Sequence, residues 1–509
     1  MDCVEIGREA KRVNEAPAAD RLPLTVRHSV LQPLLAVFAV FILFRIGYFI
    51  AGVRFDASPL TWYWQFIDPA LLRAHLGQSL WYLHSQPPAF NLFLGIVLKL
   101  FPGHELAAFV ACYLLLGLVF AAAMLLLLRG FGVPDVLSAV AVAIYVASPT
   151  FVLFENWLFY TYPVTVLLLL AALFWQRFVW RRRYLDALLL FICAALLALT
   201  WSLFHLVWLL ALVFALVLLQ RRDWRKVLAA AAIPLLVVAF WYGKNLVQFG
   251  QFTGSTWFGM SLSKMTNCAL TGPERQALYA SGVISPGSFI QPFSSPDRYY
   301  GDAPKPLPTG IPVLDQELKP SGAPNYNNVV FVAVSRQYGR DALRILAAYP
   351  SAYLRTVVIS YLRCFRPASS DPVLARNAAH VSTLIRLEEI VFDGRFSYHR
   401  QPAADPVIHF QQCLSETGWF IAIAYALAFA IGLVLLLRPA LRAQRSSLFF
   451  LWFNAVWVVI AANAVEIGEN DRFRFAADPL VFALLVAVAV ALVRNLRSRR
   501  GMPASRGPA

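Results

Sequence analysis

Charged residues are scarce in this chain, and their scarcity excludes most classes of soluble protein. Asp, Glu, Lys and Arg make up 14% of the 509 residues, 59% are hydrophobic, and the mean hydropathy is +0.61. Soluble domains carry about 25% charged and about 45–50% apolar residues. Several apolar runs reach the roughly 20 residues that a helix needs to cross a bilayer. The composition therefore indicates a polytopic membrane protein.

Cysteine pairs and nucleotide motifs are also missing. The six cysteines show no CxxC spacing, which argues against a zinc knuckle or a dithiol redox site. The sequence contains no Walker P-loop, no GxGxxG after a strand, no HExxH and no GxSxG. Nothing in the sequence is therefore typical of nucleotide binding, zinc proteolysis or serine hydrolysis.

Acidic residues are fewer than basic ones, 28 against 44, which gives a net charge of +16. The Arg and Lys residues cluster in short segments between apolar runs, as the positive-inside rule describes. This distribution argues against nucleic acid as a partner. It indicates instead which loops face the cytoplasm.

Long apolar runs predict about ten membrane-spanning helices, near residues 30–51, 105–128, 134–153, 158–176, 185–201, 203–220, 226–243, 416–437, 446–465 and 475–493. An extra pair of spans within 340–400 would raise the number to twelve. Residues 327–367 have a helical apolar period that Pro350 interrupts. We expect an all-α bundle of about 10–12 transmembrane helices with juxtamembrane helices.

The basic connections predict the orientation of this bundle. With a cytoplasmic N-terminus, the basic segments 177–183, 221–226, 438–445 and 494–500 all fall on the cytoplasmic side. Both termini are then cytoplasmic. The predicted organisation is a cytoplasmic tail 1–29, a transmembrane catalytic module 30–243 with an outer loop 52–104, a large outer loop 244–415, transmembrane helices 416–495 and a cytoplasmic tail 496–509.

Two acidic residues stand next to predicted spans on the outer side, where burial of a carboxylate is costly and often functional. Asp68 precedes Pro69 in "FIDPALL", so it is either a helix N-cap or a reactive carboxylate. Glu155 lies in the short turn "LFENWLF", so it is either a solvated turn residue or part of a site. We take both as candidate catalytic residues.

Basic residues on the same side are candidates for binding a phosphate group. They are Lys244 in "YGKNLVQFGQFTGS", Arg363, and the pair Arg472 and Arg474 in "ENDRFRFAADP". Guanidinium groups bind phosphate in a two-pronged fashion. The alternative for the last loop, which also holds Glu469, is an interfacial network of salt bridges.

The stretch "WYLHSQPPAF" adds His84 and Gln86 between two apolar regions. Its two prolines end one helix and allow another to start near Pro88. His84 is then either a structural corner residue or a contact to a phosphate group or a metal ion. Gln86 is a supporting residue of the same candidate site.

In order along the chain, these motifs resemble the GT-C superfamily of integral-membrane glycosyltransferases. The similarity is to the branch of protein O-mannosyltransferases and lipid A aminoarabinose transferases, and it covers about 30–265 and 327–495. "HSQPPAFNLFLG" is similar to the family's (H/K)xPP element, "YGKNLVQFG" to its RNxxxFGxP and "ENDRFRFAADP" to its ERYxxPxxP. Here Asp68 is followed by Pro rather than a second acid, and Lys244 replaces an Arg.

The resemblance implies an inverting transfer of a sugar from a polyprenyl-phosphate donor to an envelope glycan, lipid or protein, on the periplasmic face of a bacterial inner membrane. Asp68 would be the general base. Glu155 would orient the acceptor or hold an optional Mg²⁺ or Mn²⁺ with His84 or Asp68. Lys244, Arg472, Arg474 and Arg363 would neutralise the donor phosphate, with Gln86 and Glu469 in support.

Two other classes remain open. A transporter or flippase of a lipid-linked sugar would use the same groove without chemistry. A membrane assembly factor would use none of these residues chemically. Carboxylates at span ends rather than in mid-span favour the enzyme.

Overall fold

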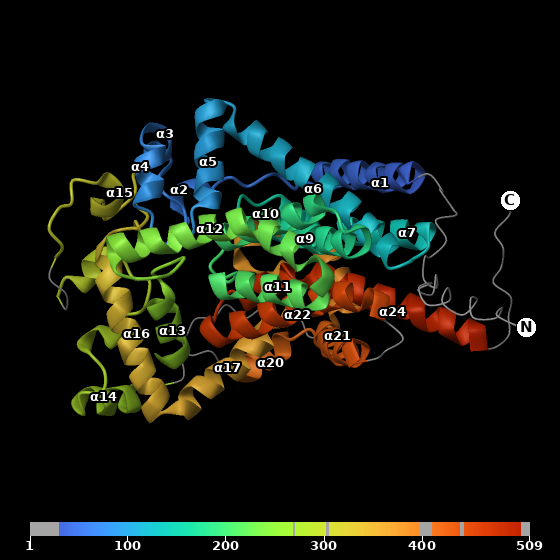
Figure 1. Ribbon diagram of the computed structural model, residues 1–509. Coiled ribbons are helices and arrows are strands. Elements are labelled where there is room, and N and C mark those ends of the chain that lie inside the picture. The colour runs from blue at the N-terminus through green and yellow to red at the C-terminus, as the bar shows by residue number, and fades with distance from the viewer. Residues whose placement is uncertain (1–29, 268–269, 302–304, 397–409, 438–441, 500–509) are drawn as a thin grey trace, which may run out of the picture.

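The structure, a computed structural model, describes residues 30–267, 270–301, 305–396, 410–437 and 442–499. The expected tail 1–29 and the last ten residues of the expected tail 496–509 lie outside these residues. In the described part of the chain, regular secondary structure is helical, with two isolated β-bridges and no strand (Figure 1). The prediction of an all-helical protein is confirmed.

Five helices among the described residues are long and apolar enough to cross a membrane: α1 (Leu31–Ile50), α6 (Glu105–Gly130), α9 (Thr161–Arg181), α12 (Trp224–Phe249) and α22 (Arg442–Val465). Two bent pairs raise the number to seven if each is one span: α7 (Asp135–Ala147) with α8 (Pro149–Glu155), and α16 (Val330–Ala348) with α17 (Pro350–Cys364). Further apolar helices are α5 (Ala89–Leu100), α10 (Tyr184–Thr200), α11 (Leu206–Leu219), α21 (Trp419–Leu437) and α24 (Asp478–Arg499). The ten regions predicted to span are all helical, while the number of ten to twelve spans stays a prediction.

Short helices connect these long ones. They are α2 (Pro59–Trp62), α3 (Pro69–Ala74), α4 (Leu76–Trp81), α13 (Phe258–Asn267), α14 (Gly272–Ala280), α15 (Pro312–Asp315), α18 (Ala375–Ala378), α19 (Ser382–Glu388), α20 (Phe410–Glu416) and α23 (Asn470–Phe475). Six 3₁₀ turns lie at Arg221–Asp223, Pro286–Phe289, Pro296–Tyr299, Ala368–Ser370, Pro372–Leu374 and Ala379–Val381, and one π-helical turn at Glu389–Asp393.

Proline causes both sharp bends, because it lacks the backbone N–H that continues a helix. At Pro149 the pair α7–α8 bends by 61°, and the Ser148 hydroxyl caps α8 by accepting from the Phe151 N–H at 3.3 Å. At Pro350 the pair α16–α17 bends by 105°. The predicted interruption at Pro350 is confirmed.

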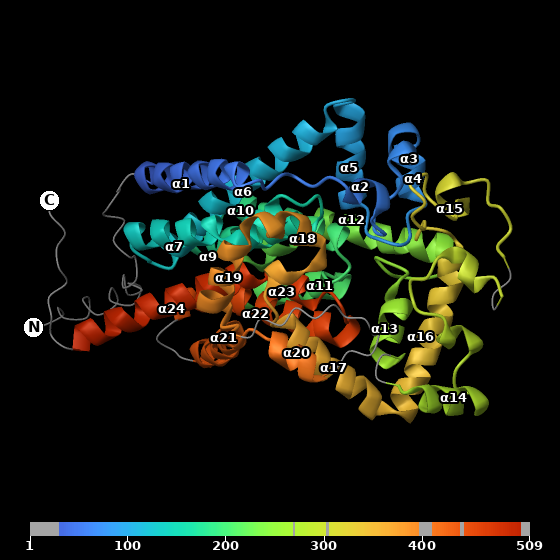
Figure 2. The ribbon, with the colours of Figure 1, turned by 180° about the vertical axis from the view of Figure 1, so that it is seen from behind.

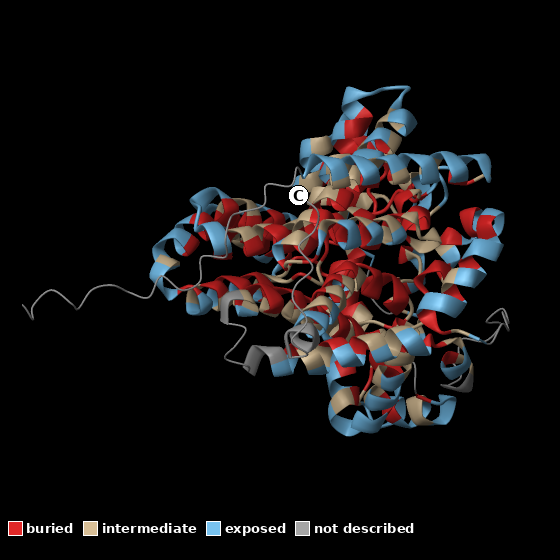
Figure 3. Cartoon of the chain, turned by 90° about the vertical axis from the view of Figure 1, so that its right-hand side faces the viewer, coloured by how far each residue is buried: buried red, intermediate tan, exposed pale blue. Residues whose placement is uncertain are grey.

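Apolar surface covers the outside of the bundle. The helix α1 buries only Val37, Phe41 and Tyr48 of its 20 residues, and Ile50 is 78% exposed. In Figure 3 the buried residues fill the interior, while the outward faces of the helices are exposed. Helices that are apolar on both faces are typical of a protein surrounded by lipid.

Contacts join the described basic connections at one end of this bundle, while residues 438–441 of the predicted basic segment 438–445 lie outside the described residues. Arg182 contacts Gln220 and Asp223, so the connections after α9 and after α11 are neighbours. Arg494 of α24 donates to the carbonyl oxygen of Gly132 at 2.5 Å, which places the turn between α6 and α7 beside the end of α24. Figures 1 and 2 show the start of α1 and the end of α24 at this same end, with α13 to α16 at the other.

A buried ion pair joins α1 to Glu155, which is the last residue of α8 and not, as expected from the sequence, a residue of the turn that follows. Arg45 donates to the two carboxylate oxygens of Glu155 at 2.8 and 2.7 Å, and the Tyr162 hydroxyl donates to the same carboxylate at 2.8 Å. Arg45 also lies over the Phe41 ring, 3.9 Å from its centroid. Removing one partner of such a pair leaves an uncompensated buried charge, which costs about 3–5 kcal/mol.

We therefore expect Glu155→Ala to lower the free energy of unfolding by about 3–5 kcal/mol, because Arg45 would remain charged inside the protein. Thermal unfolding of the purified full chain in detergent measures this. The matched control is Glu105→Ala, which breaks the exposed Arg73–Glu105 pair and should leave the melting temperature close to that of the unchanged protein. Equal losses in the two variants would contradict a structural role of Glu155.

Candidate functional site

A cavity of about 590 Å³ lies where the helical bundle meets the segments after α12. Its wall comes from the end of α22, the start of α23, the turn between α10 and α11, the loop after α12, and α13. The helices α10, α12 and α22 each start at a basic connection and end at this wall. The cavity and the basic connections are therefore at opposite ends of the same helices.

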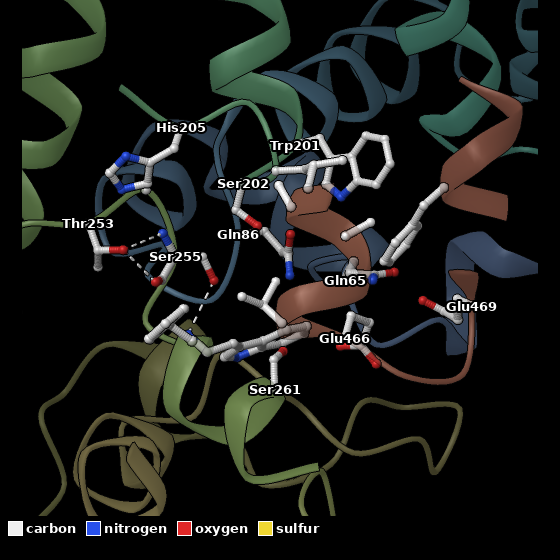
Figure 4. Close-up of a pocket in the computed structure, with 18 of the residues that line it drawn as sticks. Gln65, Gln86, Trp201, Ser202, His205, Thr253, Ser255, Ser261, Glu466 and Glu469 are labelled. Atoms are coloured by element: carbon white, nitrogen blue, oxygen red, sulfur yellow. Dashed lines mark hydrogen bonds between the residues drawn. The ribbon is translucent and has the colours of Figure 1, made fainter. Parts of the chain in front are cut away.

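The lining combines aromatic rings with amides, hydroxyls and charged groups. The rings are those of Trp64, Tyr160, Trp201, Phe252, Trp257, Phe258, Phe293, Trp457 and Phe473. The polar side chains are those of Gln65, Gln86, Gln251, Ser202, His205, Thr253, Ser255, Ser261, Lys264, Glu466 and Glu469. Figure 4 shows Gln65, Gln86, Glu466 and Glu469 around the same hollow, although they come from three separate segments.

The loop after α12 is fixed by its own turn chemistry. Gly250 ends α12 with φ +64°, a left-handed conformation that favours glycine. The Thr253 hydroxyl accepts from the Ser255 N–H at 3.3 Å, and the Ser255 hydroxyl donates to the carbonyl oxygen of Ser85 at 2.5 Å. These bonds hold "QFTGS" against "HSQPP", so two motifs quoted for the resemblance meet at the cavity.

The acidic part of the wall is the loop "EIGEN" between α22 and α23. Gly468 has φ +135°, which an L-residue with a side chain rarely adopts. Glu466 forms an ion pair with Lys264 of α13, and its Oε1 also accepts from the Ile467 N–H at 3.1 Å. Glu469 accepts from Arg472 at 2.5 Å and from the Tyr63 hydroxyl at 3.0 Å.

These two carboxylates have opposite pKa shifts. Burial raises the pKa of Glu466, and the positive charge of Lys264 offsets this only in part. Burial also acts to raise the pKa of Glu469, but the charges of Arg472 and Lys264, with hydrogen bonds from Arg472 and Tyr63, lower it below its ordinary value. Glu469 is therefore the carboxylate that stays ionised, and Glu466 is the one suited to take up a proton.

The two candidate catalytic residues lie away from this lining. Asp68 is buried, and its Oδ1 accepts from the Ala70 N–H at 3.0 Å as the N-cap of α3. The carboxylate of Glu155 is held by Arg45 and Tyr162. Neither residue belongs to the cavity wall, so the structure gives both a structural contact, and their catalytic roles stay predictions.

The predicted phosphate-binding residues are mostly committed to protein partners. Lys244 donates to the carbonyl oxygen of Leu83 at 2.7 Å and lies 3.7 Å from the centroid of the Trp241 ring. Arg474 donates to the Cys364 carbonyl at 2.8 Å and to Asp478 at 3.0 Å. The contacts of Arg474 correspond to the structural alternative considered for the last loop.

Arg472 and Arg363 sit behind the acidic loop. Arg472 is fully buried, donates to Glu469 and donates to the Thr161 hydroxyl at 3.0 Å. Arg363 donates to the carbonyl oxygen of Gly468 at 3.3 Å. Both therefore position the wall of the cavity, and neither is part of its lining.

His84 and Gln86 differ in whether they reach the cavity. Both ring nitrogens of His84 are engaged, Nδ1 with the Thr256 hydroxyl at 2.8 Å and Nε2 with the Asn327 carbonyl oxygen at 3.0 Å. Gln86 lines the cavity, as does Glu469. Of the nine residues singled out from the sequence, these two reach the cavity.

Lining residues outside the nine named above include Lys264, Gln65, Gln251 and Glu466. Lys264 lies in "SLSKMTN", which matches no motif, and its partner Glu466 is 202 residues away. Gln65 Oε1 and Gln251 Nε2 are buried without a hydrogen-bond partner. Gln65 is close to Asp68 in the sequence, and the repeated amides in "WYWQF" and "FGQF" were the available signal.

The described residues contain no group of three or more His, Cys, Asp or Glu side chains arranged to hold a metal ion. The optional Mg²⁺ or Mn²⁺ therefore stays a prediction. Within the described part of the chain, Cys112, Cys193 and Cys364 form no disulfide bond.

Comparisons of the chain with protein-family models, curated proteins and solved structures found no match.

Burial lowers the pKa of His84 to about 3, well below the ordinary value of 6.5. His84 is neutral in the folded protein but can be protonated in the unfolded chain. The unfolded state therefore binds one more proton below pH 6.5. The stability from His84 is thus present above pH 6.5 and is lost as the pH falls toward 3. We expect the free energy of unfolding to drop by roughly 1.4 kcal/mol per pH unit below pH 6.5 on this account.

Thermal unfolding in detergent at pH 7.5 to 5 tests this expectation. His84→Gln should flatten the pH dependence of stability, because glutamine takes up no proton in this range. The exposed His75 supplies the matched control, and His75→Gln should keep the full dependence. An unchanged pH profile in His84→Gln would refute the buried neutral imidazole.

Proposed function

We propose that this protein is a membrane glycosyltransferase that transfers a sugar from a polyprenyl-phosphate donor to an envelope glycan, lipid or protein. The motifs that resemble the GT-C superfamily supply the reaction class. The cavity at the end of the apolar helices supplies a place for the reaction. With the basic connections in the cytoplasm, this cavity opens on the periplasmic side of a bacterial inner membrane.

The chemistry of the cavity wall carries the proposal. Ligand pockets of about 300–1,000 Å³ combine aromatic walls with a few placed polar groups. A sugar ring matches this lining, because its C–H faces pack on rings such as Trp201 and Trp257 while its hydroxyls bond to amides. Gln65 and Gln251 each have a buried polar atom that lacks a protein partner. Such atoms are costly unless a ligand or water satisfies them.

The rim of the cavity suits a donor that arrives from the membrane. The lining residues Phe252 and Phe258 are 54% and 58% exposed, and Val247 at the end of α12 is 86% exposed. Exposed apolar side chains beside a polar cavity fit a substrate with a polar head and a hydrocarbon tail. A polyprenyl-phosphate sugar has this form.

We assign the proton transfer to Glu466 and not to Asp68, because Glu466 lines the cavity whereas Asp68 caps α3. The acceptor oxygen forms a bond to the anomeric carbon, and its proton passes to Glu466. The bond from that carbon to the phosphate oxygen breaks, and its electron pair stays on the phosphate. Glu469, held ionised by Arg472, stabilises the positive charge that develops on the sugar ring.

A transporter or flippase of a lipid-linked sugar is the second candidate. The observation that favours it is the pair of bent helices, α7–α8 and α16–α17, since transporters build their sites at interrupted helices. A transporter would move the lipid-linked sugar without releasing polyprenyl phosphate. Product release therefore separates the two functions, and an assembly factor would do neither.

Purified full chain, incubated with a panel of polyprenyl-phosphate-linked pentoses and hexoses and envelope acceptors, should release polyprenyl phosphate detectable by mass spectrometry. Glu466→Gln should lower the rate by roughly 10²–10⁴-fold, the range for loss of a general base. Asp68→Asn should keep most activity, because asparagine also caps a helix. Loss of activity in Asp68→Asn with retention in Glu466→Gln would return the base to Asp68.

A further inference from the structure

Lys264 is the one lysine or arginine, within the described part of the chain, that lines the cavity. The neighbouring cations are occupied elsewhere: Lys244 by a backbone carbonyl, Arg474 by Asp478 and two carbonyls, and Arg472 by Glu469. Lys264 extends from α13, which packs closely on α16. It is thus the only charged donor that the described wall offers to a ligand.

The partner of Lys264 is itself part of the wall. The Lys264 and Glu466 side chains are 23% and 13% exposed. In the neighbouring Arg472–Glu469 pair the carboxylate is 24% exposed, but its cation Arg472 is only 1% exposed and offers a ligand no positive charge. Lys264 reaches Glu466 as a point charge on a flexible stem, without the two-pronged geometry of a guanidinium. Of the two ion pairs at the cavity, the one with Lys264 is the one that a ligand can reach and open.

Unsatisfied polar groups lie in the same wall. The Gln65 side chain is 91% buried, and its Oε1 lacks a hydrogen-bond partner, as does Nε2 of Gln251. Both residues line the cavity together with Lys264. Buried polar atoms without partners in a cavity point to a ligand that supplies them.

We propose that Glu466 is a displaceable internal counterion, and that the phosphate group of a ligand takes its place on Lys264. This inference rests on the proposed function for the role of the phosphate, which is the leaving group there. It differs from the phosphate contacts expected from the sequence, because it uses none of Lys244, Arg363, Arg472 or Arg474. The carboxylate of Glu466 balances the positive charge of Lys264 as long as no anion is bound in the cavity.

Displacement changes the charge around Glu466. The groups that face it are Lys264 and the Ser261 hydroxyl from α13, the Ile467 N–H, and Glu469, which is backed by Arg472. Once the phosphate holds Lys264, Glu466 faces the negative charge of Glu469 in a buried site. Both burial and this like charge favour its protonated form. Phosphate binding therefore makes Glu466 a stronger base, and binding strengthens as the pH falls into the range where Glu466 takes up a proton.

The same exchange fits the transfer step. A donor whose phosphate binds Lys264 frees Glu466, and the freed carboxylate accepts the proton of the acceptor hydroxyl. The phosphate gains one negative charge when its bond to the sugar breaks, and Lys264 lies beside it. Proton uptake and leaving-group stabilisation thus fall to two residues that are paired before the ligand arrives.

Binding of a farnesyl phosphate probe to the full-length protein in nanodiscs tests the exchange without requiring any reaction. Glu466→Gln removes the competing charge but keeps the shape, so it should tighten binding by roughly tenfold, within the usual range for coupled sites. It should also remove the part of the pH dependence that Glu466 contributes between pH 5 and 8, leaving the titration of the probe's own phosphate, whose second pKa is about 6. Lys264→Gln should weaken binding, and the double variant Lys264→Gln with Glu466→Gln should show no gain.

The double variant leaves no unpaired charge, so it keeps the test valid if Lys264→Gln alone unfolds. Glu317→Gln is the matched control, since it breaks the exposed Lys305–Glu317 pair and should leave binding unchanged. Farnesol tests the tail alone, and inorganic phosphate tests the head alone. Tight binding of inorganic phosphate would assign the site to a free anion rather than a lipid headgroup.

The exchange would be overturned by unchanged affinity for farnesyl phosphate in Glu466→Gln, or by a double variant that binds as tightly as Glu466→Gln. Failure of the proposed function looks different: the probe would bind with the expected pattern, but no polyprenyl phosphate would be released from any donor. Sugar transfer with no tightening in Glu466→Gln would refute the exchange alone.

Discussion

The ion pair between Arg472 and Glu469 is the interaction on which the cavity depends. Arg472 is fully buried, and it lies against the Phe159 ring, 4.7 Å from its centroid. Through Glu469 it reaches the Tyr63 hydroxyl, and through Thr161 it reaches the start of α9. A buried guanidinium is tolerated only when its charge and donors are matched. The pair therefore fixes the loop "EIGEN", and with it the position of both cavity carboxylates.

Neighbouring charges in the same short helix follow this pattern. Asp471 of α23 accepts from Arg366 at 2.7 Å, and Arg474 donates to Asp478 at 3.0 Å. The pair of Asp471 with Arg366 holds α23 to the residues just after α17. The pair of Arg474 with Asp478 holds it to the start of α24. The stretch "ENDRFRF" has the arginines that phosphate binding would need, and its charged residues hold helices together. The reason is energetic, since an arginine without an anion would be far too costly at such depth.

This outcome separates what the sequence could predict from what it could not. The helices follow from local apolar runs, the bend at Pro350 from the missing N–H, and the cap at Asp68 from the Asp-Pro pair; all three depend on neighbouring residues only. The contacts that decide the site join distant residues, such as Lys264 with Glu466. Motif order placed Gln86 and Glu469 in the wall, because the loops that carry them meet at one end of the bundle.

A long-range partner also explains why the carboxylate of Glu155 is held away from the cavity. Glu155 is matched by Arg45, which lies 110 residues earlier in an apolar run where a single arginine has no local explanation. Near a membrane each buried charge must find an opposite charge or hydrogen-bond partners, so most polar residues at the ends of the spans are used in such contacts. The residues left for a ligand are those whose pairing is accessible or incomplete. In this cavity they are Lys264 with Glu466, and the amides of Gln65 and Gln251.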